Sequence, residues 1–150
     1  MGRLLPTRTD ASVDRSGEPS VICIDDEEAR AVFEALASET AYKVFRLLNE
    51  EPATPSTVAE RLDMSVQNVH YHLEKLEDAA LIEVADTCYS EKGREMDVFV
   101  VSEDPTLVFL GTSDDSPGLK HAVKSLTSFV GPPAVLIALG ETVSRLFGAE

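Results

Sequence analysis

Apolar residues recur at helical spacing through two consecutive stretches of the chain, 29–36 and 41–48. In both stretches they lie three or four positions apart, which predicts amphipathic helices with one buried face each. Asp25 with Glu28 fits a capping box at the start of the first helix, and Ser38 is the predicted N-cap of the second. The faces expected to be buried are Ala29, Val32, Phe33 and Leu36 in the first helix, and Ala41, Val44, Phe45 and Leu48 in the second.

A short third helix and a longer fourth helix are predicted after the polar break "NEEPATP". Thr54 as N-cap and Pro55 at the first helical position start the third helix, "PSTVAERLD". Ser65 is the predicted N-cap of the fourth helix, so the connection between the two is a tight turn. The apolar residues of the fourth helix fall within about 80° of one another on a helical wheel. This predicted core stripe consists of Val66, Val69, Leu73, Leu76 and Ala80.

Alternating apolar and polar positions at 81–89 and 96–101 flank the polar turn "SEKGRE", which predicts a β-hairpin. "VICI" at 21–24 is either a strand or an apolar lead-in to the first helix, and "TLVFLG" is either a further strand or a lead-in. Helical spacing returns at 119–130 and again at 134–147. The predicted fold class is therefore mainly α with a β-hairpin wing, in an α+β arrangement.

The composition, 43% hydrophobic and 27% charged over 150 residues, is that of one soluble globular domain. No apolar run reaches the roughly 18 residues of a membrane-spanning helix, so no membrane association is expected. Cys23 and Cys88 form no CxxC pair, which favours a reduced, cytoplasmic setting. Residues 1–20 contain no apolar run typical of a signal peptide and are expected to form a flexible tail.

Acidic residues outnumber basic residues by 27 to 13, giving a formal net charge of −14. Taken alone, this charge argues against a nucleic-acid partner, because phosphate binding normally depends on Lys and Arg. The acids are spread along the whole chain, and this pattern resembles that of proteins from halophilic archaea, where molar salt screens charges within about 3 Å. The negative net charge is therefore interpreted as evidence about the solvent in which the protein works, and not as evidence about its partner. The candidate phosphate contacts are Arg46, Arg61, Lys75, Lys92 and Arg94.

Two short helices joined by a tight turn and followed by a hairpin describe a winged helix-turn-helix, expected here over residues 21–102. Gln67, Asn68, Tyr71 and Lys75 lie opposite the apolar stripe of the fourth helix. Gln and Asn side chains pair with adenine edges, and Lys and the Tyr hydroxyl can contact guanine or phosphate. This side of the helix is expected to enter the major groove of double-stranded DNA.

His70 and His72 are two residues apart, so one helix cannot present both of them to the same metal ion. His72 is interpreted as a structural residue at the edge of the core, and His70 as either structural or a phosphate contact. No metal site and no cofactor are expected, and no effector pocket is identified. Cys88 is either a redox-active thiol or a small packing residue.

The segments "ALASETAYKVFRLL", "TPSTVAERLDMSVQNVHYHLEKLEDAALIEV" and "YSEKGREMDVF" resemble ArsR-type winged-helix transcriptional regulators, and in particular their haloarchaeal branch. The resemblance covers about residues 28 to 102. It implies that helix 65–78 is the recognition helix and that turn 90–95 is the wing, which lies along the DNA backbone. The cysteine-bearing motif of the family's metal sensors is absent from "VAERLDMS", so metal sensing is not implied. The predicted DNA-binding residues are Ser65, Gln67, Asn68, His70, Tyr71, Lys75, Lys92 and Arg94.

A single winged helix covers only one DNA half-site, so the expected assembly is a homodimer. Segment 103–150, with its predicted strand and helices, is the expected dimerisation segment. The helix at 26–37 is a further candidate for the dimer surface. The alternative is that segment 103–150 packs onto the winged helix of its own chain. A second functional class is a winged helix that binds protein within the transcription machinery, without itself binding DNA. No Gly-rich phosphate loop or nucleophile elbow indicates an enzyme.

Overall fold

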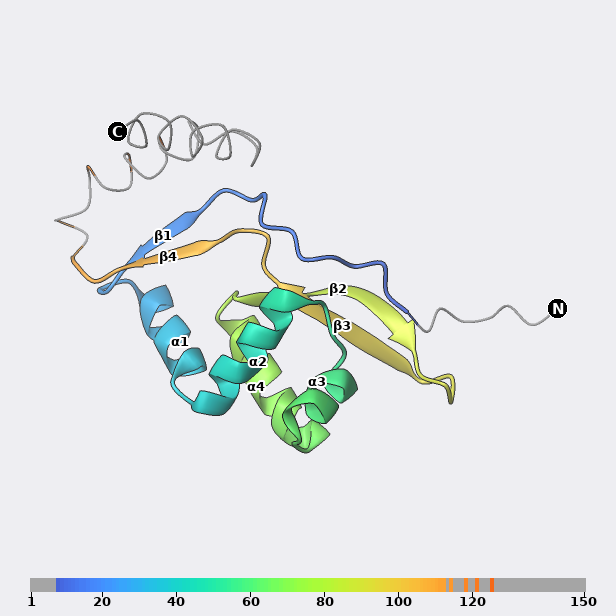
Figure 1. The fold of residues 1–150 in the computed structure, drawn as a ribbon. Coiled ribbons are helices and arrows are strands. Elements are labelled where there is room, and N and C mark those ends of the chain that lie inside the picture. Colours follow the sequence, from blue (N-terminus) through green and yellow to red (C-terminus); the bar gives the residue numbers. More distant parts are fainter. Residues whose placement is uncertain (1–7, 113, 115–117, 119–120, 122–124, 126–150) are drawn as a thin grey trace, which may run out of the picture.

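The computed structural model describes residues 8–112 together with residues 114, 118, 121 and 125. Four helices are followed by an antiparallel hairpin, and a separate two-stranded ribbon lies beside them (Figure 1). This is a winged helix-turn-helix fold, which confirms the predicted fold class. Of the predicted helix at 119–130 the structure describes residues 121 and 125 alone, and the predicted helix at 134–147 lies outside the described residues. The elements are β1 Ser20–Cys23, α1 Glu27–Leu36, α2 Glu39–Glu50, α3 Pro55–Leu62, α4 Val66–Asp78, β2 Ile82–Tyr89, β3 Glu95–Val101 and β4 Thr106–Phe109.

Three of the four predicted helix caps are confirmed. The hydroxyls of Ser38, Thr54 and Ser65 each accept a hydrogen bond from the backbone N–H three residues further on, at the starts of α2, α3 and α4. The capping box predicted at Asp25 is wrong, because α1 begins one residue later and its N-cap is Asp26. The Asp26 carboxylate accepts instead from the backbone N–H of Cys23 at 2.7 Å, and so joins the end of β1 to the start of α1.

Helix α4 lies at the centre of the fold and packs against the other three helices and β2. Val69, Leu73 and Leu76 of its predicted stripe are buried in the common core. Val66 and Ala80 do not belong to that core. Val66, the first helical residue, is 41% exposed, and Ala80 follows the helix end with a left-handed φ of 55°. The largest fully buried side chains are Leu48, Leu73, Leu76, Val44, Val58, Val69, Val98, Val101 and Cys23.

Helix α1 buries a narrower face than its sequence pattern predicts. Ala29, Val32 and Ala35 are buried, whereas Phe33 is 44% exposed. Because successive helical residues are about 100° apart, Phe33 points to the side of Val32, and it does not belong to the core cluster. Phe33 was therefore wrongly assigned to the core, and it leaves an aromatic ring on the surface.

The hairpin β2–β3 is antiparallel, as predicted, with Ile82 opposite Val101 and Tyr89 opposite Glu95. A register shift between Val84 and Asp86 marks a β-bulge in β2. Ala53 and Phe99 exchange two backbone hydrogen bonds of 3.0 and 2.9 Å, so the loop between α2 and α3 pairs with β3. This pairing fixes the hairpin beside the helix-turn-helix.

The strand alternatives for 21–24 and 106–111 are both correct, and these two strands pair with each other. β1 and β4 are parallel, with Ser20 opposite Thr106 and Cys23 opposite Phe109. Residues 8–19 run from this ribbon along the hairpin (Figure 1). The Thr9 hydroxyl donates to Asp86 at 2.7 Å and lowers the pKa of that carboxyl. Segment 8–19, assigned to a flexible tail from the sequence, thus contacts the domain.

Candidate nucleic-acid interface

The turn between α3 and α4 sets the angle at which α4 leaves the core. Asp63 ends α3 in the left-handed conformation, with a φ of 51°. The backbone N–H of Met64 donates to the carbonyl of Ala59 at 3.0 Å, which closes the last turn of α3. Ser65 then caps α4 immediately, so the two helices of the motif are joined by three residues.

One side of α4 is open to solvent over its whole length, opposite the buried residues Val69, Leu73 and Leu76. The open side carries two amides, an imidazole, a phenol and an ammonium group. None of these groups is packed inside the described part of the chain, so all of them are accessible to a partner. The exposed residues that the sequence predicted here are Ser65, Gln67, Asn68, His70, Tyr71 and Lys75.

Tyr71 and Lys75 form a pair on this open side. The Lys75 Nζ lies 4.8 Å from the centre of the Tyr71 ring, a cation–π distance. The hydrogen bond to Tyr71, followed by charge interaction with the same residue, raises the pKa of Lys75. Lys75 is therefore fully protonated at neutral pH and presents a positive charge in the last turn of α4.

His72 is buried, in contrast to His70. Its ring meets the Tyr71 ring edge to face, with 5.2 Å between centroids and 74° between planes. Burial and, secondarily, the nearby Lys75 charge lower the pKa of His72 below its ordinary value of 6.5. His72 is thus a neutral structural residue whose ring packs against the ring of Tyr71.

Acidification is expected to weaken the fold through His72. The pKa of His72 is lowered in the folded state, so the unfolded chain binds the proton more readily. The contribution of neutral His72 to the free energy of unfolding is therefore complete above pH 6.5 and is lost as the pH falls below that value. The free energy of unfolding, measured with urea between about pH 7.5 and about pH 5.5, should decline more steeply for the natural chain than for His72→Gln. His70→Gln, on the exposed side of the same helix, should keep the natural slope. Equal slopes for all three proteins would refute the structural role of His72.

The wing is a tight turn between β2 and β3. Gly93 adopts a φ of +75°, which side-chain-bearing residues rarely adopt, and its N–H donates to the Ser90 carbonyl at 2.8 Å. The Ser90 hydroxyl accepts from the backbone N–H of Arg94 at 3.0 Å. This bonded turn holds Lys92 and Arg94 at the exposed tip of the hairpin.

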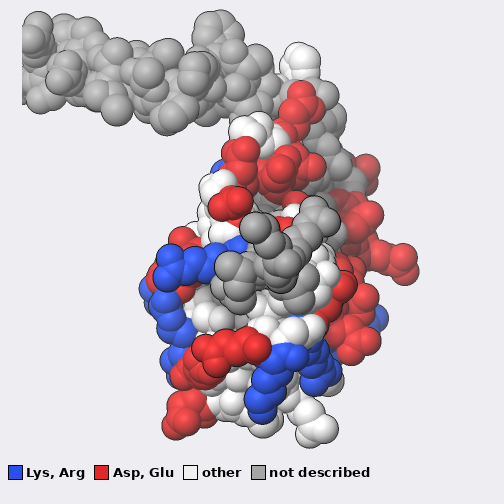
Figure 2. Space-filling model, turned by 90° about the vertical axis from the view of Figure 1, so that its right-hand side faces the viewer, with Lys and Arg blue, Asp and Glu red and all other residues white. Residues whose placement is uncertain are grey.

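The wing cations differ from most other cations in being unpaired. Within residues 8–112, neither Lys92 nor Arg94 forms an ion pair with a carboxylate, and the same holds for Lys75, whereas the candidate cations Arg46 and Arg61 are paired with Glu50 and Glu51. Figure 2, which views the hairpin side, shows basic side chains gathered at the edges of this face among acidic ones. Because a paired cation must break its ion pair to contact phosphate, the wing offers the more available positive charge.

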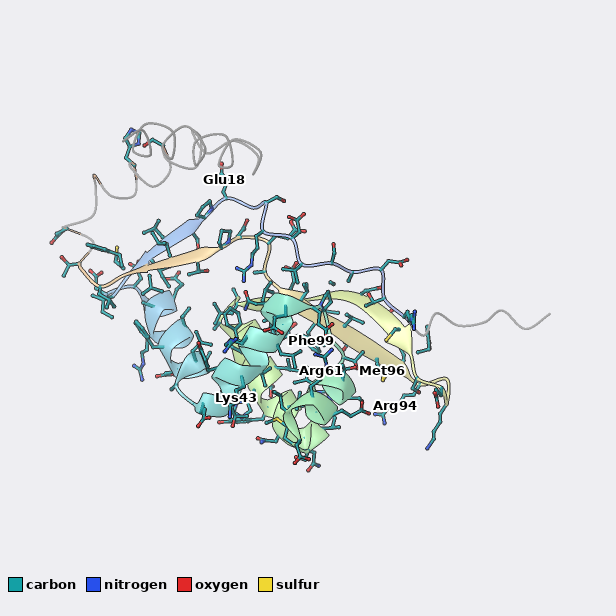
Figure 3. All side chains as sticks on the ribbon, viewed as in Figure 1. Glu18, Lys43, Arg61, Arg94, Met96 and Phe99 are labelled. Atoms are coloured by element: carbon teal, nitrogen blue, oxygen red, sulfur yellow. The ribbon has the colours of Figure 1, made fainter. Side chains whose placement is uncertain are left out.

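A groove of about 280 Å³ separates the wing from the two helices of the motif. Figure 3 shows Met96 on β3 and Arg94 in the adjoining turn, and both residues line the groove. Ser56, from the first turn of α3, also lines the groove. Its position could not be predicted, because nothing in the sequence pattern places α3 beside β3. The groove is lined by Pro55, Ser56, Val66, His70, Arg94, Glu95, Met96 and Asp97.

The described residues offer no cluster of three or more His, Cys, Asp or Glu side chains able to hold a metal ion. Cys23 and Cys88 are both buried, and burial followed by the charge of Asp86 raises the pKa of the Cys88 thiol. A raised pKa leaves little reactive thiolate, so the geometry favours the packing interpretation of Cys88. No helix in the described part of the chain is long and apolar enough to cross a membrane.

Residues 25–85 match a protein family described as "Helix-turn-helix domain". The match spans α1 to the start of β2 and agrees with the observed winged helix-turn-helix fold. No curated protein sequence matches the chain.

Several solved structures resemble the chain. Reduced HlyU from Vibrio cholerae N16961 is 15% identical, with 81% of this chain and 90% of that chain covered and a TM-score of 0.43. An ArsR-like transcriptional regulator from Rhodococcus sp. RHA1 is 23% identical, with 82% and 89% covered and the same TM-score of 0.43. Reduced AbfR bound to DNA is 19% identical, with 79% and 82% covered and a TM-score of 0.34. At TM-scores below 0.5 these likenesses do not assign the chain to a family.

Proposed function

We propose that this chain is a sequence-specific, DNA-binding transcriptional regulator of the ArsR type that acts as a homodimer. In this proposal α4 enters the major groove and the wing, residues 90–95, contacts the DNA backbone. The amides of Gln67 and Asn68 read base edges, and Lys92 and Arg94 contact phosphates. The proposed activity is binding, so it requires no catalytic site.

The observation that carries the proposal is the division of α4 into two sides. The buried side fixes the helix through Val69, Leu73 and Leu76, while the opposite side exposes hydrogen-bonding groups that the fold itself does not use. The amino-terminal residues of a recognition helix are those that contact bases in helix-turn-helix proteins. Gln67 and Asn68 occupy the first turn of α4 and are both exposed.

The acidic composition determines the conditions under which binding should be observed. Counterion release supplies most non-specific affinity in dilute buffer, and it contributes little when the surrounding salt is already concentrated. We infer that the chain works in molar salt, where base contacts and shape carry more of the binding. Binding measured in molar KCl should therefore retain sequence preference.

Exposed aromatic and aliphatic side chains support the proposed homodimer. Phe33 on α1 is 44% exposed, and Ile24, Leu107 and Leu110 near the β1–β4 ribbon are also exposed. Large apolar side chains are a common component of subunit interfaces. Helix α1 and segment 103–150 are accordingly the proposed dimer surfaces.

Phe33→Glu is expected to weaken the dimer by about 30-fold or more in Kd, since a buried aromatic at an interface centre typically contributes at least that much. Sedimentation equilibrium measures the change. Tyr42→Glu is the matched control, because Tyr42 is also an exposed aromatic residue, at 53%, on α2. If the dimer Kd is unchanged in Phe33→Glu, α1 is not part of the dimer interface.

A second candidate function is a protein-binding winged helix, and the charge of α4 favours it. Residues 65–80 contain Lys75 against Glu74, Glu77 and Asp78, which is unfavourable beside phosphate. An electrophoretic shift assay in molar KCl, with duplexes selected from a random pool by the full chain, separates the two functions. A retarded, sequence-dependent complex is expected for a DNA reader, and enrichment of no sequence would support the protein-binding alternative.

A further inference from the structure

Val66 is an apolar side chain on an otherwise polar surface. The sequence pattern assigns it to the core stripe, but it is 41% exposed while Val69, one turn on, is fully buried. It is the first residue of α4 and directly precedes Gln67 and Asn68. More than half of Val66 is covered by its neighbours, but the remainder leaves apolar surface in contact with water, which the fold itself does not use.

The position of Val66 is the one from which a recognition helix contacts bases. The amino-terminal turn of such a helix lies deepest in the major groove. The major-groove edge of thymine differs from that of every other base by its 5-methyl group, which is read by apolar contact. Val66, Gln67 and Asn68 together therefore supply the apolar and amide groups needed to read an adenine–thymine step.

The groove next to Val66 suits an apolar group better than a phosphate. Pro55 and Met96 line it together with Val66, whereas Glu95 and Asp97 supply two carboxylates that repel an anion. A methyl group carries no charge and meets no such repulsion. Arg94 and His70, also at this groove, remain available to the backbone around the base.

We propose that Val66 reads the 5-methyl group of a thymine in the major groove and so determines part of the sequence specificity. This inference rests on the proposed DNA-binding function. It assigns a recognition role to a residue that the helical pattern places in the core.

The test starts from the duplex that the full chain selects from a random pool in molar KCl. Each thymine of that duplex is replaced in turn by deoxyuridine, which lacks only the 5-methyl group, and affinity is measured by fluorescence anisotropy. Loss of one contacted methyl should weaken binding about fourfold, the effect of one buried methyl-sized group. Other thymines should tolerate the replacement.

The Val66→Ala variant should bind the thymine and deoxyuridine duplexes nearly equally at the sensitive position. Val84→Ala is the matched control, because Val84 is a valine of the same exposure, 42%, on β2 and away from the groove. This control should keep the fourfold difference. Because deoxyuridine alone probes the natural chain, the test does not depend on how the variant folds.

Three results would overturn the inference, and they are distinguishable. If the selected DNA binds equally well with every thymine replaced, the protein contacts no methyl group. That result refutes the role of Val66 but leaves the proposed function intact. Methyl sensitivity that persists in Val66→Ala assigns the contact to another residue. Failure to select any duplex overturns the proposed function itself, and the role of Val66 with it.

Discussion

Replacing both Gln67 and Asn68 by Ala should abolish the sequence preference of the protein while leaving its stability nearly unchanged. Each bidentate amide–base pair contributes about 1 to 3 kcal/mol of discrimination, so losing two such pairs should reduce the ratio of specific to non-specific affinity by at least about 30-fold. Both side chains are exposed in the first turn of α4, so no core contact is lost. Competition binding in molar KCl measures the ratio, and thermal unfolding measures the stability.

A matched pair on the same helix controls for changes to its surface. Glu77 and Asp78 are also exposed, but they lie at the carboxy-terminal end of α4. Glu77→Ala with Asp78→Ala should retain the preference. If the Gln67 and Asn68 variant unfolds, or if it still discriminates between sequences, the assignment of this side of α4 to DNA is wrong.

Leu73→Ala should have the opposite effect and lower the free energy of unfolding by about 2 to 5 kcal/mol. Leu73 is 1% exposed at the centre of the cluster formed by all four helices and the hairpin, so its removal leaves a cavity that the surrounding side chains only partly fill. Loss of DNA binding should follow from loss of folding and should be reversed at lower temperature or with stabilising salt. Urea unfolding followed by circular dichroism measures the change.

Val84→Ala provides the control for truncation of an apolar side chain. Val84 lies on β2, outside the proposed dimer surfaces, with 42% of its surface exposed, and surface substitutions of this kind usually change stability by about 0.5 kcal/mol or less. A loss for Leu73→Ala no larger than that for Val84→Ala would contradict the buried position of α4.

The elements that depend on local chemistry could be predicted from the sequence. Ser38, Thr54 and Ser65 each have a hydroxyl three residues before an N–H that needs an acceptor, and all three cap their helices. Gly93 supplies the left-handed residue that the wing requires. These signals act within one turn of the chain, so no knowledge of tertiary packing was needed.

The errors fall where tertiary packing decides the outcome. Val66 and Phe33 satisfy helical spacing, but they are 41% and 44% exposed in the fold, and a helical wheel does not show which neighbouring elements cover a position. The parallel pairing of β1 with β4 joins residues 86 positions apart, and short apolar runs do not specify such a partner. The groove beside Ser56 likewise arises only when β3 is placed against α3.

The most direct test of DNA recognition by α4 is to map the duplex onto the protein by NMR. Amide shifts of the isotope-labelled full chain would be followed in molar KCl as the selected duplex is added. The largest changes should fall on the first two turns of α4, from Gln67 to Tyr71, and on the wing at Lys92 and Arg94. Changes confined to α1 and the β1–β4 ribbon, with the exposed side of α4 unaffected, would contradict the proposal.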